Sequence, residues 1–502
     1  MDNVVFALSP DRRVARVSRR SFGSFVEHLG RCVYTGIFEP GHPRADAGGM
    51  RLDVVDLVRE MGVSSVRYPG GNFVSGYRWE DGVGPRNARP ARLDLAWHSL
   101  EPNTFGLDEF MAWAQLARVE PVMAVNLGMR GVADALDLLE YANVRADSRM
   151  AQLRARNGHE DPYGIRMWCL GNEMDGPWQL GHKTAYEYGR IAAETARAMR
   201  AMDPGVELVA CGSSASDMPT FGEWERVVLG ETYDLVDYVS LHRYYEMVDG
   251  DLPSFLASVV DMDQFIESVV ATIDHVGAVK RSNRRINLSF DEWNVWYQSR
   301  LEDQVPTDWP VAPRLLEDRY SMADAAVVGN MLITLLRHSD RVTAASQAQL
   351  VNVIAPIVTE PGGPAWRQTT FHPFAQASRY ARGEVLRLSP GGPLFSTQKY
   401  GDVASVDAVA TWDEGSGEAA VFAVNRNPHR DVVVTVDARA LGTDAVLGLT
   451  TMNAADPSTT NTAASEAVRP RPADVTADGT TVSFVAPSIS WNVLRLGRQE
   501  GR

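Results

Sequence analysis

"WCLGNEMDGPWQ", residues 168–179, places an Asn, a Glu, an Asp and two Trp residues around two glycines, directly after the start of a short apolar run. A short apolar run that ends in turn residues is typical of a buried strand leading into a loop. A strand that only had to turn could use Gly, Asn and Asp alone. The carboxylate, carboxamide and indoles at this strand end therefore indicate a role beyond turning the chain.

Runs of this kind recur eight times between about residues 20 and 375, and longer amphipathic segments separate them. They cover residues 20–29, 63–71, 120–128, 165–173, 206–214, 237–245, 286–294 and 342–352. Segments 51–62 and 184–203 place apolar residues at three- and four-residue spacing and end at helix-stop residues. Strands that alternate with helices in this way predict a (β/α)8 TIM barrel. The rival is an open doubly wound sheet, which would typically carry a Gly-rich phosphate loop after its first strand, and the sequence has none.

After about residue 380, apolar and polar residues alternate between clusters of turn residues, as in residues 418–427, 431–439 and 480–497. This pattern predicts a C-terminal antiparallel, jelly-roll-like β-sandwich. We expect the barrel to span residues 20–378 and the sandwich to comprise residues 1–19 and 379–502. The first strand, "NVVFAL" at 3–8, should pair with the sandwich, and the polar stretch 453–479 should form a long surface loop. The sandwich has no aromatic cluster, so we expect its role to be structural.

The bulk composition restricts the partners. With 502 residues the chain is too long for one ordinary core, and its net charge of −15 argues against a nucleic-acid or anionic-membrane partner. No run of about 18 apolar residues occurs, and the first twenty residues have no signal-peptide pattern, so we expect a cytoplasmic protein. The cysteines, Cys32, Cys169 and Cys211, are expected to be buried free thiols rather than a nucleophile.

The residues at the predicted strand ends share one chemistry. Barrel enzymes place their active sites at the carboxyl ends of the strands. Here those ends carry Glu27, His28, Arg67, Asn72, Asn126, Asn172, Glu173, His242, Tyr244, Asp291, Glu292, Gln349 and Asn352, and the adjoining loops carry Trp97, Trp178, Trp293 and Trp296. Sugars require such a mixture, because their hydroxyls need hydrogen bonds and their C–H faces rest on aromatic rings. A phosphate site would show more Lys and Arg, and metal-ligand spacings such as HExxH are absent.

Two glutamates stand out. Glu173 ends the fourth strand and Glu292 ends the seventh, so only a fold that closes through space could bring them together. Glycoside hydrolysis needs such a pair, one carboxylic acid to protonate the leaving oxygen and one carboxylate to attack the anomeric carbon or activate water. The sequence therefore points to a glycosidase.

At this level of detail the chain resembles glycoside hydrolase family 51, the α-L-arabinofuranosidases, within a large clan of retaining (β/α)8 glycosidases. The resemblance covers nearly the whole length. It is carried in order by "FVEHLGRCVYTGIFEPGHP" (25–43), "VRYPGGNFVSGYRWEDGVGP" (66–85), "LAWHSLEPNTFGLDEF" (95–110), "WCLGNEMDGPWQLGHKTA" (168–185), "VSLHRYY" (239–245), "DEWNVWY" (291–297) and "QAQLVNVIAPI" (347–357). The Asn-Glu pair and the distant Glu alone would indicate only the clan.

The resemblance implies a role for each matching residue. Glu173 would be the general acid/base and Glu292 the nucleophile. The substrate would be bound by Glu27, Asn72, Trp97, Asn172, Trp178, Tyr244, Trp296 and Gln349, with Asn172 on the sugar 2-hydroxyl and Tyr244 on the nucleophile. Arg67 and His242 would orient the carboxylates of Glu173 and Glu292 without contacting the substrate. Cys32 and Asp291 would be further neighbours of the site. One departure is visible, because Gln298 stands where a His is expected after "DEWNVWY", which affects the rim of the site.

Several strand-end residues also have a plain structural interpretation. Tyr245 competes with Tyr244, because adjacent strand residues face opposite sides. His28 could be either a buried structural histidine or a residue of the site. Asp175 could serve only as a turn residue, and His98 and His182 are expected to be structural.

We therefore expect a cytoplasmic, retaining exo-α-L-arabinofuranosidase that acts on arabinoxylan or arabinan oligosaccharides. It would require neither a metal nor an organic cofactor, since two carboxylates and water suffice. The family resemblance implies a homo-oligomer, a hexamer. Alternatives are a β-xylosidase or endo-β-glucanase on the same frame, or a non-catalytic carbohydrate-binding protein. The blocks around Glu27, Asn72 and Gln349 favour a blind pocket over an open cleft, and retention of both glutamates speaks against a binding protein.

Overall fold

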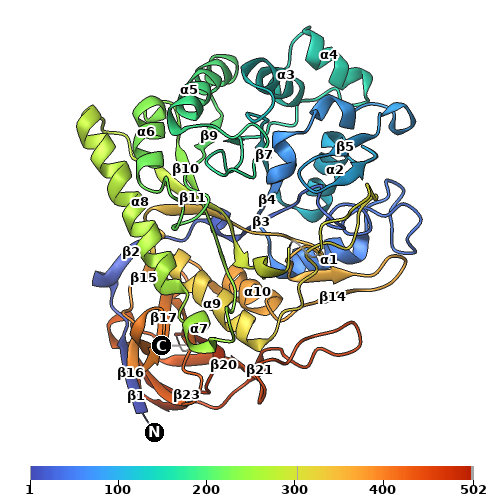
Figure 1. Cartoon of the computed structure of the whole chain (residues 1–502). Coiled ribbons are helices and arrows are strands. Elements are labelled where there is room, and N and C mark those ends of the chain that lie inside the picture. Colours follow the sequence, from blue (N-terminus) through green and yellow to red (C-terminus); the bar gives the residue numbers. More distant parts are fainter. Residues whose placement is uncertain (1, 302–303, 499–502) are drawn as a thin grey trace.

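Eight parallel strands close into a barrel in the computed structural model, which describes residues 2–301 and 304–498 (Figure 1). Each strand pairs in parallel with its neighbours, and the last pairs with the first. The strands are β3 (Gly23–Phe25), β4 (Ser65–Tyr68), β7 (Glu120–Ala124), β8 (Met167–Leu170), β9 (Glu207–Ala210), β10 (Tyr238–Tyr245), β11 (Asn287–Val295) and β12 (Val342–Gln347). Each of the eight predicted runs overlaps one of these strands, β11 extending one residue beyond its run, so the predicted barrel is confirmed over the rival open sheet.

Helices cover the outside of the barrel. They are α1 (Leu52–Met61), α2 (Leu107–Ala117), α3 (Val132–Asn143), α4 (Arg149–Arg156), α5 (Ala185–Met202), α6 (Glu223–Thr232), α7 (Leu252–Leu256), α8 (Val259–Lys280), α9 (Met322–Arg337) and α10 (Phe371–Tyr380). The predicted stop at Gly62 is confirmed, because this residue ends α1 with a φ of 75°, which a glycine adopts without strain. Thr184 begins α5 through a capping box with Glu187. Across residues 2–301 and 304–498, no helix has both the length and the apolar character that a bilayer crossing requires.

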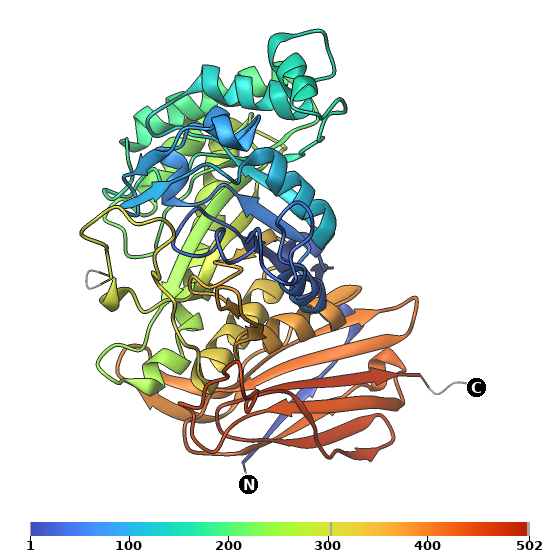
Figure 2. The ribbon, with the colours of Figure 1, turned by 90° about the vertical axis from the view of Figure 1, so that its right-hand side faces the viewer.

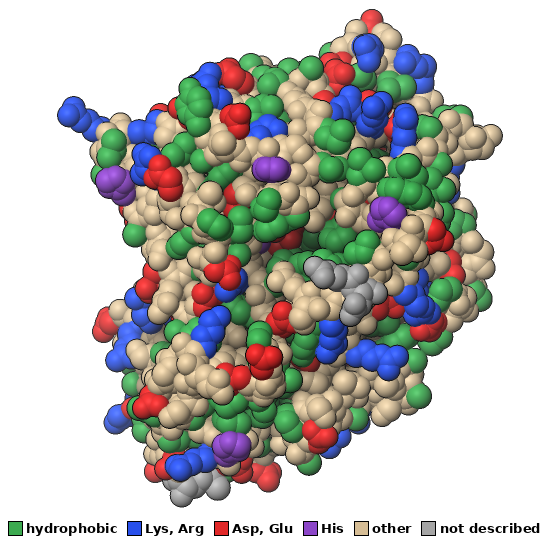
Figure 3. All heavy atoms as spheres, in the orientation of Figure 1, with side chains coloured by type: hydrophobic (Ala, Val, Ile, Leu, Met, Phe, Trp, Pro, Cys, Tyr) green, Lys and Arg blue, Asp and Glu red, His purple; other side chains and the backbone are tan. Residues whose placement is uncertain are grey.

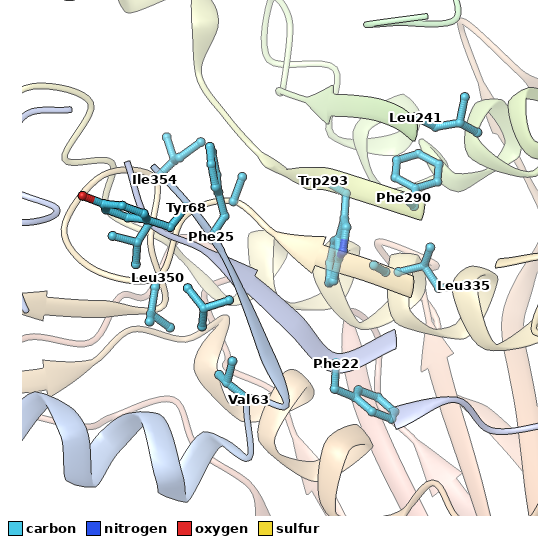
Figure 4. Close-up of a cluster of buried hydrophobic side chains, with 14 of the residues drawn as sticks. Phe22, Phe25, Val63, Tyr68, Leu241, Phe290, Trp293, Leu335, Leu350 and Ile354 are labelled. Atoms are coloured by element: carbon cyan, nitrogen blue, oxygen red, sulfur yellow. The ribbon is translucent and has the colours of Figure 1, made fainter. Parts of the chain in front are cut away.

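The hydrophobic core runs from the barrel strands into the helices behind them. Figure 4 shows a part of it, where Leu241 of β10, Phe290 of β11 and Leu335 of α9 lie in one buried cluster. Trp293 of β11 is fully buried in the same cluster. It is therefore a core residue and not one of the site's tryptophans.

A β-sandwich lies beside the barrel, at the bottom of Figure 2, and contains both the first strand and the last. One sheet has the order β1 (Asp2–Ala7), β19 (Val432–Asp437), β23 (Thr481–Ala486), β22 (Thr476–Asp478). The other has the order β2 (Arg13–Arg16), β15 (Glu384–Leu386), β17 (Gly401–Asp413), β18 (Glu418–Asn425), β24 (Ser490–Gly497), β20 (Ala445–Met452), β21 (Arg471–Pro472), with β16 (Gly391–Thr397) on β17.

The N-terminal strand joins the sandwich as predicted, by pairing with β19. That pair is parallel, whereas the other pairs in the two sheets are antiparallel, so the predicted antiparallel sandwich is confirmed with this one parallel pair added. The reason is that β1 enters from the distant start of the chain, and no hairpin dictates its direction. Residues 453–479 are mostly loop, with the short strands β21 and β22 at their end. The domain boundaries at 19/20 and 378/379 stay a prediction.

Helix α9 connects the barrel to the sandwich. A Cβ on Gly329 would stand 2.5 Å from Cε3 of Trp491 on β24, so the glycine allows the two elements to approach closely. Nearby, the buried Asp407 of β17 accepts hydrogen bonds from Arg337 and, at 2.6 Å, from Asn330, both on α9. Apolar packing and a buried ion pair thus hold the sandwich against the barrel.

Candidate active site

The two glutamates separated in sequence meet at the carboxyl end of the barrel. Glu173 follows β8, and Glu292 lies in the last part of β11, where it is in register with His242 of β10. One oxygen of each carboxylate and one ring nitrogen of His242 all lie within 4.8 Å of one another. Glu173 has a φ of 44°, in the left-handed region that a side chain rarely adopts, so the loop after β8 presents this carboxylate at a conformational cost.

Glu292 is held by two donors, one on each oxygen. Arg67 donates to Oε1 at 2.8 Å and the Tyr244 hydroxyl donates to Oε2 at 2.7 Å. Burial raises the pKa of Glu292 and Glu173 adds to the rise, whereas His242, Arg67 and Tyr244 oppose it by stabilising the charged form. The neighbouring Tyr245 turns away and donates to Asp261 at 2.8 Å, so the choice of Tyr244 places the correct side chain at the site.

Glu173 contacts a tryptophan and a histidine. Trp178 donates from its indole nitrogen to Oε2 at 2.6 Å, and His242 donates from Nδ1 to Oε1 at 2.9 Å. The other ring nitrogen of His242 donates to Asp291 at 3.0 Å. Burial lowers the pKa of His242, but Glu292, Asp291 and Glu173 outweigh it and raise the pKa to about 10. The histidine is therefore an imidazolium that bridges the acidic groups.

A third carboxylate, Glu27, is buried close to Glu292. It accepts hydrogen bonds from the backbone N–H of Phe73 at 2.8 Å, from the Trp97 indole at 2.9 Å and from Gln349 at 2.9 Å. Burial raises the pKa of Glu27 to about 8, although the donors from Phe73 and Trp97 favour the ionised form. Within the described residues, Gln349 Oε1 and Trp296 Nε1 are buried without a hydrogen-bond partner, which leaves an acceptor and a donor for a ligand hydroxyl.

The two asparagines of the predicted set also lie together. Arg67 donates to Asn172 Oδ1 at 2.6 Å, and Asn172 donates to Asn72 at 3.5 Å. Gln179 donates to the same oxygen of Asn72 and accepts from Ser75 at 2.7 Å. Gln179 was missed by the sequence reasoning, although it ends the quoted stretch, because nothing local to a glutamine after a Trp indicates that it reaches another loop.

The predicted tryptophans occupy different depths. Trp97 is buried against Glu27, Trp296 is half-buried with its ring edge-on to Tyr244 at 5.0 Å, and Trp178 is 50% exposed beside Glu173. Trp178 thus forms the outer wall on the side of Glu173. Gln298 is exposed at the start of a short 3-10 helix, η6 (Gln298–Arg300), in keeping with a position at the rim.

Other strand-end residues organise loops. Asn126 accepts from three backbone N–H groups of its own loop, Asn352 pairs with Thr359, and Asp175 accepts from Ser214. His28 is buried between Glu101 and the Tyr68 hydroxyl, 2.8 Å from each. These positions are structural, as the plain interpretation of Asp175 and His28 allowed.

Asp291 proves to be a full member of the site through its contacts with His242 and with the thiol of Cys169, which donates to it at 3.6 Å. Burial raises the pKa of Cys169 and that of Cys32, the latter to about 12, so both stay thiols. All three cysteines are buried and free, and the thiol-nucleophile alternative is disfavoured.

The spacing of Glu173, His242 and Glu292 is one that a cation could occupy. The donor set does not fit a metal, however, because an imidazolium has no lone pair to offer and both its nitrogens already donate to carboxylates. The independence from metal stays a prediction. Figure 3 shows a hollow near the middle of one face of the molecule, with acidic and hydrophobic side chains inside it.

Comparison with known proteins agrees with this geometry. Residues 57–264 match the family description "Alpha-L-arabinofuranosidase 1 domain" and residues 291–490 match "Alpha-L-arabinofuranosidase C-terminal domain". The chain is 60% identical to an intracellular exo-alpha-(1->5)-L-arabinofuranosidase from Streptomyces lividans. The alignment covers 98% of this chain and 75% of that protein. It is 52% identical to an exo-alpha-(1->6)-L-arabinofuranosidase from Bifidobacterium longum, in an alignment that covers 97% of this chain and 96% of that protein.

A solved structure extends the agreement to the fold. The family 51 alpha-L-arabinofuranosidase from Bifidobacterium longum superposes with a TM-score of 0.95 at 49% identity, covering 99% of this chain and 100% of that one. Sequence and architecture agree over the barrel and the sandwich together. The chain belongs to the α-L-arabinofuranosidases of glycoside hydrolase family 51.

Proposed function

We propose that this protein is a retaining, exo-acting α-L-arabinofuranosidase that removes terminal non-reducing arabinofuranosyl residues from oligosaccharides. The observation that carries the proposal is the short separation of the two carboxylates, which approach within 4.8 Å across His242. Retaining glycosidases hold their carboxyl groups about 5–5.5 Å apart, whereas inverting enzymes need roughly 6.5–9.5 Å for a water molecule. The names of the relatives support arabinofuranose as the sugar.

In the first step, Glu292 attacks the anomeric carbon while the bond to the leaving oxygen breaks. Glu173 gives its proton to that oxygen, and Glu292 becomes an ester of the sugar. Arg67 and Tyr244 aim the two oxygens of Glu292, one donor to each, so that the carboxylate is fixed before the substrate arrives. Trp178, on the exposed side of Glu173, marks the side from which the leaving group departs.

In the second step, Glu173 removes a proton from water, the oxygen of that water forms a bond to the anomeric carbon, and Glu292 leaves as a carboxylate. Two inversions at one carbon retain the configuration. Asn172, fixed by Arg67, is placed to hydrogen-bond the sugar 2-hydroxyl, a contact that strengthens in the transition state.

The closed end of the pocket supports exo action. Glu27 is hydrogen-bonded to Trp97, Gln349 and the Phe73 backbone, and this buried group is suited to close the pocket beyond the terminal sugar. The free acceptor on Gln349 and the carboxylate of Glu27 are suited to furanose hydroxyls. A same-frame endo-glucanase would need an open cleft here, and a binding protein would need no acid placed beside a nucleophile.

The relatives' names also support an intracellular enzyme, and an intracellular setting suits short oligosaccharides better than intact polymer. The hexamer remains a prediction, which a sedimentation-velocity measurement of the whole chain would check.

The test is hydrolysis of four aryl glycosides, the α-L-arabinofuranoside, β-D-xyloside, β-D-glucoside and β-D-galactofuranoside, by wild type and by Glu292→Ala. Hydrolysis of the arabinofuranoside that is abolished in the variant is the expected result. Proton NMR of the first product should show the α-anomer. A β-anomer, or preference for the xyloside or glucoside, would overturn the proposal.

A further inference from the structure

Three side-chain amides form a hydrogen-bonded row beside the nucleophile. The row runs from Arg67 through Asn172, Asn72 and Gln179 to Ser75. Asn172 and Gln179 belong to the loop after β8, whereas the other two polar residues of the row begin and end η3 (Asn72–Ser75), a short 3-10 helix after β4. The row therefore joins two loops at the carboxyl end of the barrel.

The backbone just before Asn72 passes close to two carboxylates of the site. A Cβ on Gly71 would stand 3.1 Å from Oε2 of Glu27 and 3.3 Å from Oε1 of Glu292. Asn72 itself is half-buried, so part of it stays accessible. Asn72 therefore lies next to the place that a sugar attacked by Glu292 would occupy.

The hydrogen bonds of the row have one direction, and Arg67 sets it. A guanidinium can only donate, so the contact of 2.6 Å from Arg67 fixes Oδ1 of Asn172 on its own side. Nδ2 of Asn172 then donates to Oδ1 of Asn72 at 3.5 Å. Gln179 donates to the same oxygen, and its own Oε1 accepts from Ser75 at 2.7 Å. The neighbours thus determine the orientation of every amide in the row.

This orientation decides which atom Asn72 offers to a substrate. A carbonyl oxygen has two lone pairs, and on Asn72 both are taken, one by Asn172 and one by Gln179. Nδ2 of Asn72 donates to no group in the described part of the chain, so it is the free end of this amide. The contact from Asn172 is at the long limit of a hydrogen bond, so the shorter one from Gln179 contributes more to holding the amide.

We infer that Gln179 is a positioning residue for catalysis, which holds Oδ1 of Asn72 so that Nδ2 donates to a hydroxyl oxygen of the terminal sugar. The inference rests on the proposed function. Ser75 and Asn72 occupy the two polar ends of Gln179, so this glutamine acts on the substrate through Asn72. Without its donor, the amide of Asn72 would be free to turn its oxygen toward the sugar.

The test is a double-mutant cycle on Gln179 and Asn72, measured as kcat/KM of an aryl α-L-arabinofuranoside. Gln179→Glu keeps the size of the side chain and the acceptor for Ser75, but its carboxylate has no hydrogen to donate to Asn72. We expect this change to lower kcat/KM by about 5- to 100-fold in the wild-type background. In the Asn72→Ala background it should cost less than about twofold, because its route to the substrate is already gone.

The pH dependence gives a second readout. Once the new carboxyl group of Gln179→Glu takes up a proton it can donate to Asn72 again, so the deficit relative to wild type should narrow from about pH 8 to about pH 4. Gln179→Met has no titrating group, and its deficit should not narrow in this way. Gln376→Glu is the matched control and should keep the wild-type kcat/KM. Gln376 also accepts one hydrogen bond and donates another, from Trp491 and to Thr450 at 2.8 Å each, but at the junction with the sandwich.

The outcomes separate this inference from the proposed function. If wild type does not hydrolyse the aryl arabinofuranoside, the proposed function fails and the inference fails with it. If wild type is active and the change at Gln179 costs the same in both backgrounds, Gln179 only shapes its loop, and the inference alone is overturned. A deficit of Gln179→Glu that stays constant over the pH range overturns the donor role. Gln179→Met provides the same cycle if Gln179→Glu does not fold.

Discussion

Replacing Tyr244 with Phe should move the acidic limb of the pH–rate profile to higher pH. The hydroxyl of Tyr244 donates to Glu292 Oε2 at 2.7 Å in a partly buried site, and removal of the donor should destabilise the ionised carboxylate of Glu292. A hydrogen bond to a charged group contributes about 1.5–3 kcal/mol. At 1.36 kcal/mol per pH unit, the pKa of Glu292 should rise by about 1–2 units.

The sign follows from the role of the nucleophile. As the proposed nucleophile, Glu292 attacks only as a carboxylate, so activity should be lost as the pH falls through its pKa, and a higher pKa should cause that loss at a higher pH. Because Glu292 interacts with Glu173, the measured limb belongs to the pair. The limb of kcat/KM reports the free enzyme and is the quantity to compare.

The assay is kcat/KM of an aryl α-L-arabinofuranoside from pH 4 to 9 for wild type, Tyr244→Phe and Tyr245→Phe. Tyr245 is the adjacent tyrosine and donates at 2.8 Å to Asp261, on the other side of the strand, so its variant loses a similar bond away from the site. An acidic limb that stays in place in Tyr244→Phe, or moves equally in both variants, would refute the assignment of Tyr244 to the nucleophile.

Three further changes have definite expected outcomes. Glu173→Gln should slow hydrolysis of an alkyl arabinofuranoside by about 10²–10⁴-fold and an activated aryl glycoside far less, because only the poor leaving group needs protonation; equal losses in steady-state rates would contradict this. Gly329→Ala should cost about 1–3 kcal/mol by pushing against Trp491, whereas Gly230→Ala, a helical glycine with nothing within 4 Å, should leave the melting temperature unchanged or higher. Asp407→Ala should cost about 1–3 kcal/mol, since it removes the acceptor of Asn330 and one of the two carboxylates that Arg337 of α9 contacts, and a thermal melt like that of wild type would contradict it.

The sequence predicted the barrel because its strands are short, apolar and regularly separated by amphipathic helices, and this pattern is local. The ends of those strands were equally visible, which is why Glu173 and Glu292 could be selected. A local pattern cannot show which strand a given strand pairs with, or whether the pair is parallel or antiparallel. Apolar and polar residues would alternate along 3–8 in the same way whether β1 ran parallel or antiparallel to β19.

The same limit explains the errors at the level of single residues. Asn126 and Asn172 both follow a barrel strand, yet the first caps its own loop and the second meets Arg67 in the pocket. Gln179 and Glu101 escaped notice because each acts through a residue from another loop, Asn72 in one case and His28 in the other. Such contacts arise from the closure of the barrel, which the spacing of residues along the chain does not record.

The charges in the site show why His242 stands between the two catalytic groups. In the proposed mechanism Glu173 enters the first step as the acid, and the carboxylates of Glu292 and Asp291 then face the cations of Arg67 and His242. The proposed first step would move a negative charge from Glu292, which becomes an ester, to Glu173, which gives up its proton. His242 Nδ1 lies 2.9 Å from Glu173 and 3.5 Å from Glu292, so one cation faces the charge before and after the step. Neutralising both states with a single fixed group avoids rearrangement of the site during the reaction.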